Sequence, residues 1–163
     1  MTSIAQPAPR RLDAFALASE PGNERLAIRR VAESASSAGI SAGRLERLKT
    51  AVAEATMNAI EHGNKNRAEI PVDVEVIQSG DEITVAISDQ GGASGPPQDP
   101  AADAEEPDLV KKLAGAQSPR GWGLFLIRNM VDAMEVTIDG QRHTVWLTMR
   151  TSAPEGAEHD EQV

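Results

Sequence analysis

Three polar side chains stand four residues apart in one stretch of the sequence: Glu54, Asn58 and His62. Apolar or small residues recur among them at helical spacing, so the stretch from 41 to 63 predicts an amphipathic helix of about six turns. Residues four apart on a helix lie one above another, which places all three side chains on nearly the same side. A carboxylate there can accept a proton, and a carboxamide oxygen can ligate magnesium.

Two glycine-containing segments follow, and each offers chemistry that suits a nucleotide. Asp89 ends an alternating strand pattern, where its carboxylate can accept a hydrogen bond from a buried donor such as the exocyclic amine of adenine, while Gly91 leaves room for the ring. Gly121 and Gly123 come just before a helical pattern, and the N–H groups at a helix N-terminus suit a phosphate. If the helix carboxylate takes the proton of a nucleophile and the carboxamide holds magnesium, these segments form a magnesium-ATP site.

The elements that must position these residues predict an α+β fold. Helical spacing recurs from 24 to 38 and from Leu124 onward, on either side of stretches that alternate with the period of a strand. The expected strands are 12–17, 72–76, 83–88, 135–138 and 144–149. We expect a two-layer α/β sandwich, with a mixed, mostly antiparallel sheet and the helices on one face.

One domain accounts for most of the chain. We expect this domain to span 12–150, after a flexible tail at 1–11 and before a disordered acidic tail at 151–163. Residues 90–120 are rich in proline, glycine and acidic side chains, and a segment of this length inside a compact domain is typical of a functional loop. We predict a mobile lid there, with one helical turn near 109–113.

Composition excludes several classes of protein. A net charge of -9, with two Trp, two Phe and no Tyr, argues against a nucleic-acid binder. No run approaches the roughly 18 apolar residues that a membrane span needs, and the N-terminus lacks the apolar segment of a secretory signal. The absence of cysteine excludes disulfides and thiolate catalysis and agrees with a cytoplasmic location. The three histidines, His62, His143 and His159, are too scattered for a metal cluster.

The three segments resemble the boxes of a known family. Residues 54–63, EATMNAIEHG, resemble the N box of the GHKL (Bergerat-fold) superfamily, in the form typical of anti-sigma-factor serine/threonine kinases. Residues 89–91, DQG, resemble its adenine-recognising glycine box, and residues 120–127, RGWGLFLI, resemble the second glycine box, which closes over the phosphates. The resemblance covers about residues 12–150, although Ala93 stands where the broader family often has a second glycine.

This resemblance implies a Bergerat ATP-binding fold that uses ATP and Mg²⁺. It implies that Glu54 is the general base, that Asn58 ligates magnesium and that Asp89 binds adenine. The remaining implied nucleotide-binding residues are Gly91, Arg120, Gly121, Gly123 and Leu124. In the anti-sigma branch such a domain typically forms a homodimer, sequesters a sigma factor and phosphorylates a serine on a STAS-domain anti-anti-sigma protein.

Our expectation is therefore an ATP-dependent serine/threonine kinase that acts as an anti-sigma factor in a partner-switching system. The alternative is a module that holds nucleotide and sequesters a partner without phosphotransfer. A histidine-kinase catalytic domain needs a preceding phosphoacceptor helix pair, and we do not expect one because the residues before Leu12 in this sequence are too few to form it.

Purely structural interpretations of the same residues also stay open. Glu54 and Asn58 could simply form the solvent face of their helix, and His62 could support the helix end or the pocket wall. The arginines at 25, 29, 30, 44 and 47 are expected on a solvated face, where the family leaves a role in partner binding open.

Overall fold

The computed structural model describes residues 8–91 and 119–152, and over 119–124 it describes the backbone alone. Its elements in chain order are β1 (Arg10–Ala18), α1 (Glu24–Ser37), α2 (Ala42–Asn58), η1 (Ala59–Gly63), β2 (Pro71–Ser79), β3 (Glu82–Asp89), α4 (Pro119–Met130), β4 (Ala133–Asp139) and β5 (Arg142–Arg150). Every helix and strand expected within these ranges is present. Residues 92–118 of the expected lid, including its helical turn, and residues 153–163 of the expected acidic tail lie outside the described residues.

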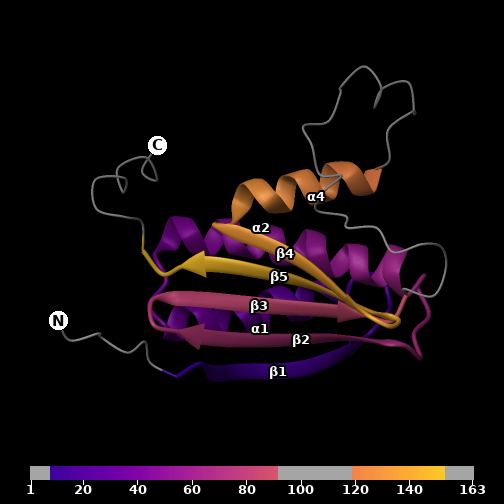
Figure 1. Ribbon diagram of the computed structural model, residues 1–163, viewed down its shortest axis with the longest axis horizontal. Coiled ribbons are helices and arrows are strands. Elements are labelled where there is room, and N and C mark those ends of the chain that lie inside the picture. Colours follow the sequence, from indigo (N-terminus) through magenta and orange to yellow (C-terminus); the bar gives the residue numbers. More distant parts are fainter. Residues whose placement is uncertain (1–7, 92–118, 153–163) are drawn as a thin grey trace, which may run out of the picture.

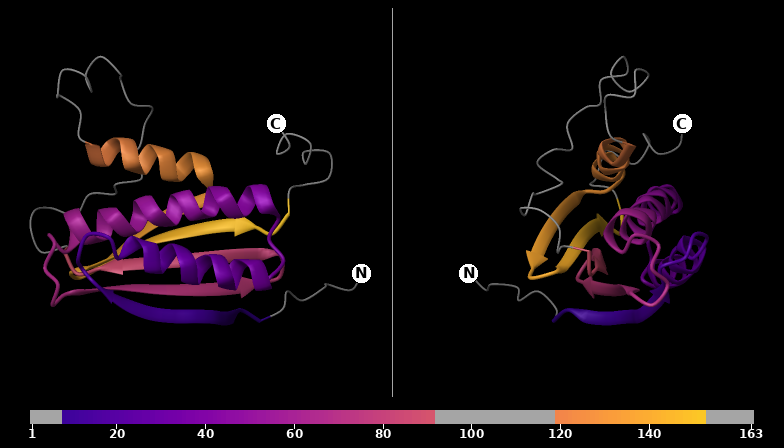
Figure 2. Two further views of the ribbon diagram at one scale, coloured as in Figure 1. Left: turned by 180° about the vertical axis from the view of Figure 1, so that it is seen from behind. Right: turned by 90° about the vertical axis from the view of Figure 1, so that its right-hand side faces the viewer.

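The five strands form one sheet in the order β1-β2-β3-β5-β4. All four pairings are antiparallel, so the sheet is not mixed as the sequence had suggested. Helices α1, α2 and α4 lie on one face of this sheet (Figures 1 and 2), which confirms the two-layer sandwich. The connection that contains α4 returns the chain to the free edge of β3, where the β4–β5 hairpin completes the sheet.

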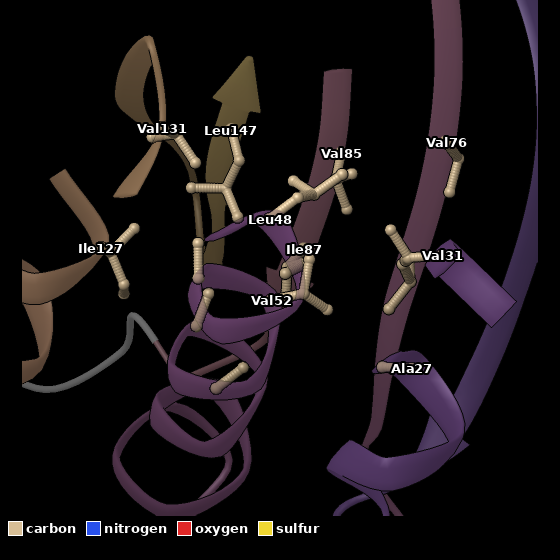
Figure 3. Packing of buried hydrophobic residues seen from close by; sticks show 14 of the residues in the cluster. Ala27, Val31, Leu48, Val52, Val76, Val85, Ile87, Ile127, Val131 and Leu147 are labelled. Atoms are coloured by element: carbon tan, nitrogen blue, oxygen red, sulfur yellow. The ribbon is translucent and has the colours of Figure 1, made fainter. Parts of the chain in front are cut away.

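The core lies between the sheet and the helices. Alternate residues of β2 and β3 face the helices and are almost fully buried: Val72, Val74, Val76, Ile83, Val85 and Ile87. Leu48 and Val52 of α2 pack against this layer (Figure 3). Burying one such side chain stabilises the fold by about 1.5–3 kcal/mol. The apolar face of α2 therefore holds this helix at a fixed height and rotation over β3.

The predicted helix over 41–63 is one continuous helical segment, but its last turn has a different geometry. After Asn58 the chain forms the π-helical segment η1, in which the Asn64 N–H donates to the Ala59 carbonyl at 2.8 Å. Gly63 ends this helix without a positive φ, although glycine often ends a helix in the left-handed conformation. The left-handed conformation occurs just after this helix, at Lys65 and Asn66, with φ of 52° and 59°. Gly63 instead allows the end of the helix to lie directly against Asp89 at the end of β3.

Two of the arginines expected on a solvated face stabilise the fold instead. Arg30 of α1 donates to both carboxylate oxygens of Asp13, at 2.9 and 2.6 Å, and its guanidinium carbon lies 4.2 Å from the centre of the Phe15 ring. This hydrogen bonding raises the pKa of Arg30. Arg44 is 4% exposed and donates to Asp132 at 2.7 Å. A helix face that looks polar in the sequence is thus partly internal, because a long side chain can reach a carboxylate on another element.

Candidate nucleotide site

The segments that carry the predicted site converge at one end of the molecule. Strand β3 ends there at Asp89, the α2–η1 helix ends there at Gly63, and α4 begins there (Figures 1 and 2). The two helices run in opposite directions, so the C-terminal end of the first faces the same way as the N-terminal end of the second. Residues separated by more than 50 positions in the sequence therefore share one end of the sheet.

Gly121 and Gly123 lie inside the first turns of α4, and not before it as expected. The helix begins at Pro119, and Arg120 and Leu124 lie in the same turns as the two glycines. Proline suits the first position of a helix because its fixed φ is helical and its missing N–H is not needed there. The backbone N–H groups of the first turn remain without helical partners, as in any helix, and can receive an anion.

Asp89 is buried at the end of β3, with 6% of its surface exposed. Its Oδ1 accepts the N–H of Gly91 at 2.9 Å. Gly63 packs directly on this carboxylate, since a Cβ added at Gly63 would lie 2.3 Å from Asp89 Cγ. A Cβ added at Gly91 would lie 1.6 Å from the Gly63 carbonyl oxygen. Both glycines are therefore required by space, and together they bring the helix end into contact with the strand end.

Asn58 and Glu54 stand one turn apart on α2, and both are half-buried. The Asn58 Nδ2 atom is buried and has no hydrogen-bond partner within the described ranges. A buried amide group left unsatisfied costs free energy, so it suits a site where an external group completes its bonding. His62 lies in η1 and is exposed, so the π turn gives it an environment different from that of Glu54 and Asn58.

A magnesium ion at Asn58 would have to be ligated by the side-chain oxygen and would have to arrive with a nucleotide. Magnesium usually takes one or two protein oxygens and completes its shell with phosphate oxygens and water. Within residues 8–91 and 119–152, no group of three or more His, Cys, Asp or Glu could hold a metal ion by itself. The single carboxamide of Asn58 therefore agrees with an ion held mainly by the phosphates.

Two residues at this end were missed by sequence reasoning. His143 pairs with Asp89 across β5 and β3, and its Nδ1 lies 3.8 Å from Asp89 Oδ1. Only the strand register could have revealed this neighbour. Asn64 follows η1, is 2% exposed, and accepts the N–H of Gln90 at 2.8 Å. A carboxamide just after a helix was visible in the sequence, but its reach to β3 was not.

A hollow of about 520 Å³ opens beside the Asp89 segment. It is lined by Gly63, Asn64, Lys65, Arg67, Glu69, Ile70, Pro71, Gln90, Gly91 and Gln141. Glu54 and Asn58 do not line it. The hollow therefore belongs to the end of the site where Asp89 lies, and not to the α2 face that carries the carboxylate and the carboxamide.

Comparison with known proteins gives one family and several relatives. Residues 17–149 match the histidine kinase-like ATPase domain family. An anti-sigma F factor of Oceanobacillus iheyensis is 32% identical over 140 residues, which is 85% of this chain and 90% of the relative. A serine-protein kinase RsbW of Listeria monocytogenes serotype 4a is 33% identical over 107 residues, which is 64% of this chain and 66% of the relative.

A solved structure shares the fold. The crystal structure of RsbU and RsbW domains from Mycobacterium tuberculosis matches with a TM-score of 0.60 at 19% identity. The match covers 91% of this chain and 34% of that longer chain.

Within the described residues, no helix has both the length and the apolar character needed to cross a membrane.

Proposed function

The chain belongs to the histidine kinase-like ATPase family, and from that premise we propose that it is an ATP-dependent serine/threonine protein kinase that acts as an anti-sigma factor. The observation that carries this proposal is the buried Asp89 at the end where α2 ends and α4 begins. That arrangement offers base recognition, a carboxamide and helix N–H groups to one ligand. The relatives named anti-sigma F factor and serine-protein kinase RsbW support the same function.

Each part of the nucleotide has a proposed partner. Asp89 accepts a hydrogen bond from the exocyclic amine of adenine, and Gly91, which has no side chain, leaves room for the ring. The first turns of α4, with Arg120, Gly121, Gly123 and Leu124, would face the phosphates. Asn58 supplies the protein oxygen to magnesium, which when bound neutralises charge that develops on the phosphates.

Glu54 is the proposed general base. It lies one turn from Asn58 on the same side of α2, which would place its carboxylate near a nucleophile approaching the terminal phosphate. The carboxylate takes the proton of a serine hydroxyl on the partner protein as the hydroxyl oxygen attacks phosphorus. The reaction forms an O–P bond to serine, breaks the bond to the leaving oxygen of ADP, and leaves the proton on Glu54.

The proposed partners follow from the relatives and the resemblance together. They are a sigma factor, which the protein sequesters in the cytoplasm, and a STAS-domain anti-anti-sigma protein, which it phosphorylates.

We also propose a homodimer. The face of the sheet turned away from the helices has no other described element packed on it (Figure 2), and so offers a surface for a second copy. Sedimentation should give about twice the chain mass of 17.3 kDa, and a monomer at all concentrations would contradict the dimer.

Calorimetric titration with ATP and ADP, with and without magnesium, tests the nucleotide site. We expect both nucleotides to bind, and we expect magnesium to strengthen binding in the wild type but not in Asn58→Ala. If neither nucleotide binds, the proposed function fails as a whole.

Phosphotransfer to a STAS-domain protein tests the kinase activity. Glu54→Gln keeps the size of the side chain but cannot accept the proton, so the rate should fall by about 10²–10⁴-fold. Glu61→Gln is the matched control because Glu61 is an exposed glutamate in η1. Undiminished transfer by Glu54→Gln would exclude it as the base, whereas nucleotide binding without any transfer by the wild type would favour the sequestering module.

A further inference from the structure

We propose that Asn64 is a positioning residue of the nucleotide site, which fixes the Asp89–Gly91 segment against the end of the α2–η1 helix. The inference rests on the proposed ATP-binding function. It adds a residue whose role is to determine where the base-recognising carboxylate stands.

The side chain of Asn64 joins three segments that are distant in sequence. Its Oδ1 accepts the Gln90 N–H at 2.8 Å, directly after Asp89. Its Nδ2 donates to Ser19 Oγ at 2.9 Å and to the carbonyl oxygens of Ile70 and Pro71, each at 3.2 Å. Asn64 thereby ties the end of β3 to the segment that follows β1 and to the start of β2.

The orientation of this amide is fixed by its partners. The Gln90 N–H is a donor and requires the amide oxygen, whereas the two carbonyl groups require the amide nitrogen. Ser19 is fully buried, and its hydroxyl donates to the Ile70 carbonyl while it accepts from Asn64. A network in which each buried group has a partner holds a single arrangement, and loss of one member leaves others unsatisfied.

The backbone around Asn64 is held in an unusual conformation. Lys65 and Asn66 follow it with φ of 52° and 59°, a left-handed region that residues other than glycine seldom adopt. Hydrogen bonds from the Asn64 and Asn66 N–H groups to the carbonyls of Ala59 and Ile60, each at 2.8 Å, fix this turn to η1. Strain of this kind persists where the surrounding structure determines it and is common beside functional sites.

The consequence for the site follows from the position of Gln90. This residue links Asp89, whose carboxylate packs on Gly63, to Gly91, whose N–H donates to that carboxylate. Without the hydrogen bond from its N–H to Asn64, the Gln90 peptide can rotate, and the carboxylate loses its fixed distance from the helix end. Base recognition is sensitive to such shifts, because misplacement by about 1 Å can cost on the order of 10²-fold.

Discrimination between ATP and inosine triphosphate measures this positioning. Inosine has a carbonyl oxygen where adenine has its amine, so the preference for ATP reports on the Asp89 contact. In titrations of the full chain with magnesium, Asn64→Ala should lower the affinity for ATP and reduce the ATP-to-inosine preference by roughly ten- to a hundredfold. The affinity for inosine triphosphate should change little.

Ser19→Ala is the matched control. It removes a buried partner of the same amide but leaves the contact of Asn64 with Gln90. We expect a lower melting temperature and an unchanged preference for ATP. If Ser19→Ala reduces the preference as much as Asn64→Ala does, the effect comes from general loosening and the proposed role of Asn64 is wrong.

Asn64→Ser provides the test if Asn64→Ala does not fold, because its hydroxyl is too short to reach Gln90 but leaves a polar group in the site. An unchanged preference for ATP in either folded variant overturns the inference while the ATP-binding function stands. A wild type that binds no nucleotide, or that binds both equally, overturns the assigned base recognition and the inference with it.

Discussion

At the scale of single residues, side-chain volume and hydrogen-bonding capacity decide whether the site can form. Gly63 and Gly91 bring two segments so close that a single methyl group has no space, although neither glycine has a positive φ. Asp89 contributes a carboxylate. Asn58 contributes an amide nitrogen that has no hydrogen-bond partner among the described residues. Each of these features depends on one residue, so each can be tested by one substitution.

Gly63→Ala should destabilise the protein and abolish base recognition, because the new Cβ would overlap the Asp89 carboxylate. Overpacking of this kind costs about 1–3 kcal/mol, which thermal or urea unfolding can measure. ATP titration of the folded fraction then measures the loss of binding.

Gly39→Ala is the control for this substitution. Gly39 has a φ of +88° and nothing within 4 Å of an added Cβ, so alanine there should cost about 1–2 kcal/mol through backbone conformation alone. ATP affinity should stay at the wild-type value. Wild-type affinity in Gly63→Ala would show that the contact with Asp89 is not required.

At the scale of secondary-structure elements, the position of α4 over α2 determines where its first turn stands. Ile127 is fully buried in the core cluster, whereas its neighbour Leu126 is 37% exposed. The packing of this one face therefore fixes the rotation of α4, and with it the direction of the N–H groups proposed to bind phosphate.

Ile127→Ala should destabilise the fold by about 2–5 kcal/mol through lost burial and the cavity left behind. Leu126→Ala, on the same helix, should change stability by less than about 0.5 kcal/mol. Denaturant unfolding of the two variants compares them directly. Equal losses would contradict the packing of α4 described here.

At the scale of the whole molecule, nucleotide binding should be visible as stability. A ligand that binds only the folded state at about 100 times its Kd adds about 2.7 kcal/mol. For a chain of this size that corresponds to a rise in Tm of roughly 5–10 °C. The same rise should be absent in Asn58→Ala when magnesium is required for tight binding.

A thermal scan with Mg-ATP, with ATP and EDTA, and without nucleotide measures this effect. An identical Tm in all three conditions would contradict a nucleotide site in this protein. The net charge of -9 should not prevent binding, because the proposed phosphate contacts are backbone N–H groups and magnesium, and not a basic surface.

The sequence by itself determined the elements and the composition of the site. Alternation in β2 and β3 and the apolar stripe of α2 follow from local periodicity, so the two-layer fold was predictable from the residues. Glu54, Asn58, Asp89 and Gly91 were identifiable because their types and order match a known set of boxes. Their roles in the site stay predictions until the titrations above are made.

Only the tertiary structure decided which residues meet. The pairing of His143 with Asp89 depends on strand register, and the reach of Asn64 to Gln90 depends on how η1 ends. Arg44 changed from an expected surface residue to a buried one because Asp132 lies within reach. Local periodicity fixes which face of an element is buried, but contacts between segments far apart in the sequence are set by the packing of the whole chain.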